Sequence, residues 1–194
     1  MIRYAAIFCA FMLVLQGVMF ASAGMIERQL DAMGSSLVTT ANHQHLLAWG
    51  LKAFPDHPGL LRHAISGAST IEEKIQLLAR LTRVTPNSAS AWAELFSTRI
   101  VSGLFDDQTR RALAEAVRLG PFEPRVNELV LGAGASRWSA LDAHSRRLVV
   151  DSGIRVIDSQ AHYRRGELLG LLRESGLIWL SCSQRPLSKD CQGL

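Results

Sequence analysis

SASAWAELFSTRIVSGLFDDQTRRALAEAVRLGPFEP, residues 88–124, is the stretch that decides the predicted fold. Ser88 and Asp106 each precede an amphipathic run, where a Ser or Asp side chain accepts a hydrogen bond from a free amide of the first helical turn. In both runs the apolar residues recur three and four positions apart, which places them on one side of a helix. Gly103 suits a turn between the runs, and Gly120, followed by proline, ends the second. The stretch therefore predicts two antiparallel helices that bury their apolar sides on each other and on neighbours.

The rest of the chain shows the same helical periodicity and no alternation of period two. Thr70 and Glu73 form a capping box at the start of one further helix. Gly132 and Gly134 are interpreted as a turn. Helices are expected over residues 46–54, 58–67, 71–81, 124–131, 138–149, 154–157 and 166–175. We therefore predict an all-α fold of eight or more helices, stacked as antiparallel hairpins without a sheet.

The central stretch resembles a tetratricopeptide repeat. Trp92 followed by Leu95 matches the opening Trp-x2-Leu of that family. The later large-apolar, Ala and Pro positions are taken by Leu113, Ala116 and Pro121. The match covers about one repeat, and it departs from the family at Phe96, where a small residue is preferred, and at Arg99, where Tyr is preferred. The resemblance implies a TPR-like α-solenoid.

The same resemblance implies a partner groove. In such repeats, the side of the helix opposite the apolar stripe faces a concave surface that takes partners. That side carries three small residues, Ser90, Ala93 and Ser97. We expect them to be exposed there, while Trp92 belongs to the core.

An apolar leader precedes this helical domain. Residues 4–26 follow Arg3 and carry no charge, and Ala21-Ser22-Ala23 is a small-x-small cleavage pattern. A helix over 4–26 would also reach about 35 Å, enough to cross a bilayer. Residues 1–23 are thus a signal peptide or a single membrane anchor, and both alternatives place a domain over 24–194 outside the cytoplasm. We expect it in the bacterial cell envelope, facing the periplasm, inner-membrane anchored or secreted.

The tail contains two cysteines, and the chain as a whole is basic. Cys182 and Cys191 flank a short tail segment, and a disulfide between them is possible in an oxidising compartment, with two free thiols as the alternative. The net charge is +4 with a pI near 9.3. Three arginine pairs, Arg110-Arg111, Arg146-Arg147 and Arg164-Arg165, are interpreted as a solvated helix face, with an anionic partner as the alternative and no nucleic-acid binding expected.

No pattern predicts a metal or cofactor site. His43 and His45 are the one tight histidine pair, and two positions on a helix are about 200° apart, so they cannot converge on a metal. Asp142, His144 and Ser145 are triad residue types, but neighbours on one helix do not align a base with a nucleophile. The sequence therefore predicts no cofactor-binding, metal or catalytic residue.

One glutamate resembles a catalytic group. Glu174 followed by Ser175 resembles the Glu-Ser of lytic transglycosylases, helical envelope enzymes whose Glu is a general acid. This chain lacks the later Gly-Leu-Met-Gln motif of that family, and only twenty residues follow Glu174. A cell-wall glycosidase is therefore the weakest alternative. The four tryptophans, Trp49, Trp92, Trp138 and Trp179, are expected as core anchors between hairpins.

A second resemblance suggests the function. Gly-Pro-Phe-Glu-Pro-Arg-Val over 120–126, with Trp138-x2-Leu141-x4-Arg146, resembles helical-repeat segments of bacterial exopolysaccharide-biosynthesis and O-antigen-type envelope proteins. The resemblance covers residues 70–157 and implies a non-catalytic adaptor that scaffolds exopolysaccharide biosynthesis or export. Its expected partners are proteins of an envelope polysaccharide complex, and the inner membrane through 4–26 if the leader is uncleaved. An adaptor for cytochrome maturation, pilus assembly or secretion is the alternative.

Overall fold

A computed structural model describes residues 12–14, 17–18, 21–31, 40–158 and 165–183. Within these ranges all regular structure is helical and there is no strand, so the predicted all-α class is confirmed. The chain forms two compact units, Met1–Ala68 and Ser69–Leu194. Each unit is described by itself.

The first unit consists of a helical segment over 21–31 and helices α2 (Thr40–Ala53) and α3 (Pro58–Gly67). Ile26 and Leu30 from the first segment pack with Leu60 of α3 in its core. Partly buried residues surround them: Leu46, Leu47, Leu51 and Phe54. A Cβ on Gly50 would lie 3.2 Å from Leu60 Cδ1 and 3.3 Å from Ile26 Cγ2, so glycine lets α2 approach both neighbours.

Polar contacts also hold the 21–31 segment to α3. A Cβ on Gly59 would collide with the Glu27 carboxylate, which therefore lies against the first turn of α3, where the helix dipole favours a negative charge. His63 Nε2 lies 3.2 Å from Asp31 Oδ1. Glu27 and Asp31 follow Ala23, so these contacts lie within the region expected to begin at residue 24, although the helical segment itself begins at residue 21.

The described part of the chain contains no helix that is both long and apolar enough to cross a bilayer. Residues 1–11, 15–16 and 19–20 of the predicted leader lie outside that part.

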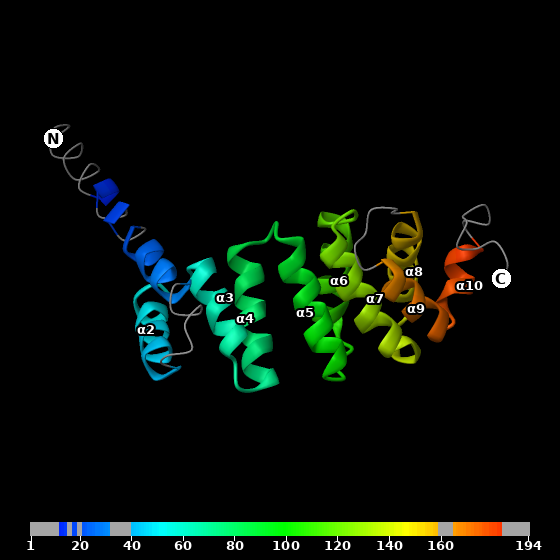
Figure 1. Cartoon of the computed structure of the whole chain (residues 1–194), viewed down its shortest axis with the longest axis horizontal. Coiled ribbons are helices and arrows are strands. Elements are labelled where there is room, and N and C mark those ends of the chain that lie inside the picture. Colours follow the sequence, from blue (N-terminus) through cyan, green and yellow to red (C-terminus); the bar gives the residue numbers. More distant parts are fainter. Residues whose placement is uncertain (1–11, 15–16, 19–20, 32–39, 159–164, 184–194) are drawn as a thin grey trace. The chain divides into compact units, whose positions relative to one another are not determined.

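The described residues of the second unit form seven α-helices, which Figure 1 shows. They are α4 (Ile71–Val84), α5 (Ala89–Val101), α6 (Asp107–Leu119), α7 (Pro124–Ser136), α8 (Ala143–Asp158), α9 (Arg165–Glu174) and α10 (Leu177–Cys182). Each of α4 to α9 packs on the helix that follows it. In addition α5 packs on α7 and α7 on α9, while α6 packs on α8 and α8 on α10. The odd-numbered helices from α5 thus form one row and the even-numbered helices from α6 another.

The predicted helix starts are confirmed by side-chain caps. Ser88 Oγ accepts a hydrogen bond from the Ala91 amide at 3.4 Å, and Asp106 Oδ1 accepts one from the Thr109 amide at 3.0 Å. Thr70 caps α4 through the Glu73 amide, but the capping box is incomplete. The Glu73 carboxylate bonds the amide and hydroxyl of the preceding Ser69 instead of the Thr70 amide.

The predicted turn at Gly132 and Gly134 is wrong, because α7 continues through both glycines to Ser136. A Cβ on Gly134 would lie 2.5 Å from Val149 Cγ2, so the missing side chain lets α8 pack closely on α7. That packing outweighs the low helix propensity of glycine, which costs about 1 kcal/mol per residue. Helix α10 was not predicted; it follows Gly176, which has a φ of 73°.

Two of the four tryptophans contradict the expectation that all are core anchors. Trp92 is buried, and its indole Nε1 donates a hydrogen bond to the Pro86 carbonyl at 2.8 Å. Trp138 is partly buried under the Arg146 guanidinium. Trp49 and Trp179 are 55% and 57% exposed. The buried positions beside Trp179 on α10 are Leu177, Ile178, Ser181 and Cys182, so the tryptophan lies on the other side of that short helix.

Candidate functional site

An open groove of about 420 Å³ lies on the row formed by α5, α7 and α9. Its walls carry aliphatic residues from all three helices: Val101, Leu129, Leu168 and Leu171. Leu168 is buried, whereas Val101 remains 48% exposed at the end of α5. The groove therefore offers apolar surface that the described residues do not cover.

Small residues keep the groove open. Ser97 contributes from α5, and Gly132 and Ala133 contribute from α7. Outside its own helix backbone, no atom of the described residues lies within 4 Å of where a Cβ on Gly132 would be, so this glycine borders the open groove. Larger side chains here would fill the groove.

Two carboxylates complete the lining, and no Lys, Arg or His is among its described residues. The Glu128 side chain is only 11% exposed, and its Oε1 lies 3.4 Å from Arg125 NH1. Glu167, near the start of α9, is exposed. The groove is thus apolar with acidic groups in its wall.

The sequence placed Ser90, Ala93 and Ser97 in an exposed partner groove. Ser97 lines the groove and is partly buried, as is Ser90, which is not part of the lining. Ala93 is fully buried, so its expected exposure is wrong. Helix α5 packs on α4, α6 and α7, which leaves only a narrow open strip on it. A partner at Ser90 or Ser97 stays a prediction.

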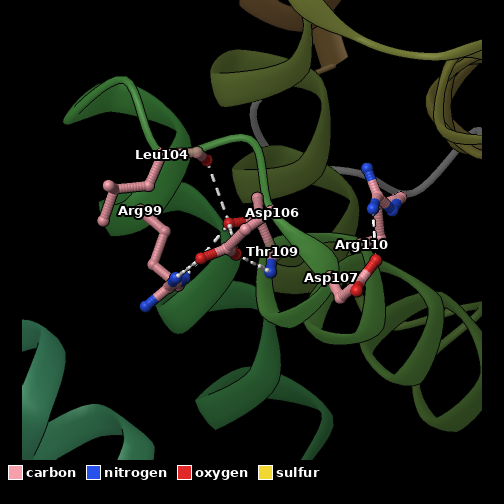
Figure 2. A network of polar contacts seen from close by, with 6 residues as sticks. All are labelled: Arg99, Leu104, Asp106, Asp107, Thr109 and Arg110. Carbon is pink, nitrogen blue, oxygen red and sulfur yellow. Dashed lines mark hydrogen bonds and ion pairs between the residues drawn. The ribbon is translucent and has the colours of Figure 1, made fainter.

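A network of hydrogen bonds and ion pairs connects α5 to α6 at the turn between them (Figure 2). The buried Arg99 donates from NH2 to Asp106 Oδ2 at 2.6 Å and from Nε to Thr109 Oγ1 at 3.1 Å. The Thr109 hydroxyl in turn donates to the Leu104 carbonyl at 2.9 Å. Arg99, the residue that departs from the repeat pattern, therefore ties α5 to the cap of α6.

The carboxylates at two helix starts are stabilised as anions. Burial opposes ionisation of Asp106, but hydrogen bonds from the Thr109 amide and the Arg99 guanidinium outweigh it, so its pKa lies below the ordinary value. The amide of Ser145 lowers the pKa of Asp142 in the same way, against a small effect of burial. Arg110 NH1 lies 3.8 Å from Asp142 Oδ2 and links α6 to the start of α8.

This arrangement accounts for the triad residue types in the sequence. Asp142 Oδ1 accepts a hydrogen bond from the Ser145 amide at 2.7 Å, which is an N-cap contact. Ser145 is buried and His144 is exposed. Asp142 and Ser145 therefore serve the start of α8 together.

The other candidate residues considered from the sequence are not among the described residues that line the groove. Glu174 is exposed at the last position of α9, outside the groove lining. His45 is exposed on α2, and the side chain of His43 lies outside the described residues. Within those residues no three His, Cys, Asp or Glu side chains group as a metal site. Cys182 is disulfide-bonded; its predicted partner, Cys191, also lies outside them.

Sequence reasoning missed the part of the groove that α7 and α9 provide. Leu129, Gly132 and Ala133 are spaced three and four apart, the spacing of one helical side. That signal was available, but the interpretation of Gly132 as a turn ended the predicted helix before it. The packing of α7 on α9 joins residues about 40 positions apart in the chain, which no local pattern predicts.

No protein-family model matches the chain, and comparisons with curated proteins and with solved structures found no match.

Proposed function

We propose that this protein is a non-catalytic helical-repeat adaptor that faces the periplasm and scaffolds exopolysaccharide biosynthesis or export. The observation that carries the adaptor role is the groove shared by α5, α7 and α9, because one apolar surface is assembled from three successive helices of one row. Such surfaces take partners without sequence motifs.

The finer architecture belongs to this proposal. We infer that the second unit is a stack of TPR-like hairpins, α5 with α6, α7 with α8 and α9 with α10. The two rows of helices support this inference, since each row joins every second helix. The polar clusters at Asp106 and Asp142 support a scaffold, because their side chains cap and connect helices.

The location and pathway rest on the sequence. The apolar leader over 4–26 supports a periplasm-facing domain, and the resemblance of residues 70–157 supports the polysaccharide assignment. A reporter that is active only outside the cytoplasm, fused after Leu194, should be active. Activity of a cytoplasmic reporter alone at that position would reverse the topology.

In-cell photo-crosslinking tests the adaptor role. A photoreactive amino acid at Ser97 is expected to capture a glycosyltransferase, polymerase or exporter of polysaccharide, identified by mass spectrometry. The same amino acid at Arg118, which is 65% exposed on α6, is the control. Capture of a cytochrome-maturation, pilus or secretion component would keep the adaptor and overturn the pathway. Equal capture at both positions would overturn partner binding in this groove.

A further inference from the structure

We propose that the chain is not cleaved after Ala23, and that residues 4–22 are retained as an anchor in a lipid bilayer. The helical segment over 21–31 then joins this anchor to α2 and α3. The sequence alone left a signal peptide and an anchor as alternatives, and the packing of this segment separates them. The inference rests on the proposed location, since it states how a periplasm-facing chain is held at the membrane.

The buried side of the 21–31 segment passes through the expected cleavage site. Ala23 is 1% exposed, Ile26 is 6% exposed and Leu30 is fully buried. These positions are spaced three and four apart, which places them on one side of a helix. Ile26 and Leu30 pack with Leu60 in the core of the first unit. Ala23, which cleavage would remove, therefore belongs to the same buried side as two core residues.

The backbone around the expected cleavage site is also helical. Residues 21–31 are helical without interruption, and Ser22 Oγ donates a hydrogen bond to the Val18 carbonyl at 2.8 Å. Proteolysis favours exposed and poorly ordered backbone, and tolerance of a truncation follows from the burial and hydrogen bonding of the backbone that it affects. By both criteria the bond between Ala23 and Gly24 lies inside a folded element.

Cleavage before folding would leave a weak attachment. The segment would retain only residues 24–31, and isolated helices shorter than about 12–15 residues are marginal in water. The packing of Ile26 on Leu60 and the 3.2 Å contact between Asp31 and His63 both come from this short piece. Retention of the leader keeps the helical residues before it, so these contacts are made by a longer helix.

The residues that precede Ala23 suit lipid. No charge occurs over residues 4–26, and the first one after them is Glu27. Four apolar residues of the leader are 45–68% exposed in the described part of the chain: Met12, Leu13, Val14 and Val18. A helix over 4–22 would be about 29 Å long, which matches a hydrocarbon core of about 30 Å. A bilayer would therefore cover apolar surface that the described residues leave open.

The mass and the location of the mature protein test the anchor directly. The full chain with a C-terminal affinity tag is expressed in bacterial cells, and the intact mass of the purified protein is measured. We expect a mass that includes the leader. We also expect the protein in a membrane fraction that resists alkaline carbonate and is released by a neutral detergent. A chain that begins at Gly24, or release by carbonate alone, would overturn the proposal.

Two matched variants test the burial of Ala23. Ala21→Leu and Ala23→Leu each place the same large side chain in the small-x-small pattern, which disfavours cleavage by a signal peptidase. Neither variant should change the mass if the leader is retained. Ala21 is exposed and Ala23 is buried. Only Ala23→Leu should overpack the first unit, and we expect trypsin to cleave it after Lys52 and Arg62 at least about fivefold faster than Ala21→Leu.

The outcomes separate this proposal from the proposed function. A heavier chain in either variant than in the unmodified protein would mean that the pattern is cleaved, and equal trypsin rates would mean that Ala23 is not packed. If the chain begins at Gly24 while the reporter after Leu194 is active outside the cytoplasm, the anchor is wrong and the periplasmic location stands. If the leader is retained while only a cytoplasmic reporter is active, the anchor stands and the location fails.

Discussion

Helix α7 carries two glycines two positions apart, and they serve opposite sides of it. Gly134 faces α8, where a Cβ would lie 2.5 Å from Val149 Cγ2. Gly132 lines the groove, where a Cβ would have no neighbour within 4 Å. Gly134 is needed because Val149 leaves no room for a side chain there. At Gly132 the described residues leave space that a side chain could fill.

Helix α5 also has one packed side and one open side, formed by other residue types. Trp92 and Ala93 are buried, whereas Ser97 borders the groove. A small side chain on these helices therefore has two meanings, close packing or an open surface. Substitutions distinguish them, because added atoms destabilise a packed side and are tolerated on an open one.

The largest effect is expected on the packed side of α5. Trp92→Ala should lower the free energy of unfolding by about 3–5 kcal/mol, because it leaves a cavity and removes the hydrogen bond to Pro86. Chemical denaturation measures the change. Trp179→Ala is the control and should cost much less, since Trp179 is 57% exposed. Equal losses in the two variants would mean that Trp92 is not a core residue.

The polar contact that joins α5 to α6 should have the next largest effect. Asp106→Ala should cost about 2–3 kcal/mol at neutral pH, because α6 loses its cap and the buried Arg99 loses its carboxylate partner. The Asp106 side chain is 56% exposed, and solvent screens its ion pair with Arg99, so we expect no larger loss in the free energy of unfolding. Thermal and urea unfolding measure it.

The lowered pKa of Asp106 predicts that the free energy of unfolding depends on pH. The pKa of Asp106 is lowered by folding, so its contribution is present above the ordinary value of about 3.9 and is lost as pH falls through the folded value. Stability measured between pH 5 and more acidic conditions should therefore fall less steeply in Asp106→Asn than in the unmodified protein. A decline in Asp106→Asn as steep as that of the unmodified protein would contradict this prediction.

These contrasts show which parts of the structure the sequence could predict. Local signals were sufficient for the helix starts at Ser88 and Asp106, because a cap depends on residues three positions away. Local signals also predicted the burial of Trp92, which lies on the apolar side of its helix with its neighbours. They failed for Ala93, because its burial depends on the other helices that surround α5.

The groove could be predicted only on its α5 side, at Ser97. Glycine is a turn former by local propensity, so Gly132 and Gly134 were assigned to a turn. Their helical state depends on the packing of α7 against α8, and the groove depends on the packing of α7 against α9. Both are contacts between segments distant in the sequence, where tertiary structure overrides propensity.

A moderate effect is expected from adding one methyl group on the packed side of α7. Overpacking costs about 1–3 kcal/mol, and replacing a helical glycine by alanine recovers about 0.5–1 kcal/mol, so Gly134→Ala should lose about 1–2 kcal/mol. A second change, Val149→Ala, should restore part of this loss, because the atoms that collide with the new Cβ belong to Val149. Additive losses in the double variant would mean that the two residues are not in contact.

The smallest effect, and the one of opposite sign, is expected at Gly132. Gly132→Ala adds the same methyl group to the same helix but places it in open space. The free energy of unfolding should therefore rise by about 0.5–1 kcal/mol, because alanine loses less backbone entropy than glycine in a helix interior. Urea unfolding of Gly132→Ala and Gly134→Ala, run side by side, compares the two sides of α7 with an identical chemical change. A loss at both positions would mean that the groove is filled in the folded protein, and a gain at both would mean that α8 does not pack on Gly134. Opposite signs are what a helix with one packed side and one open side requires.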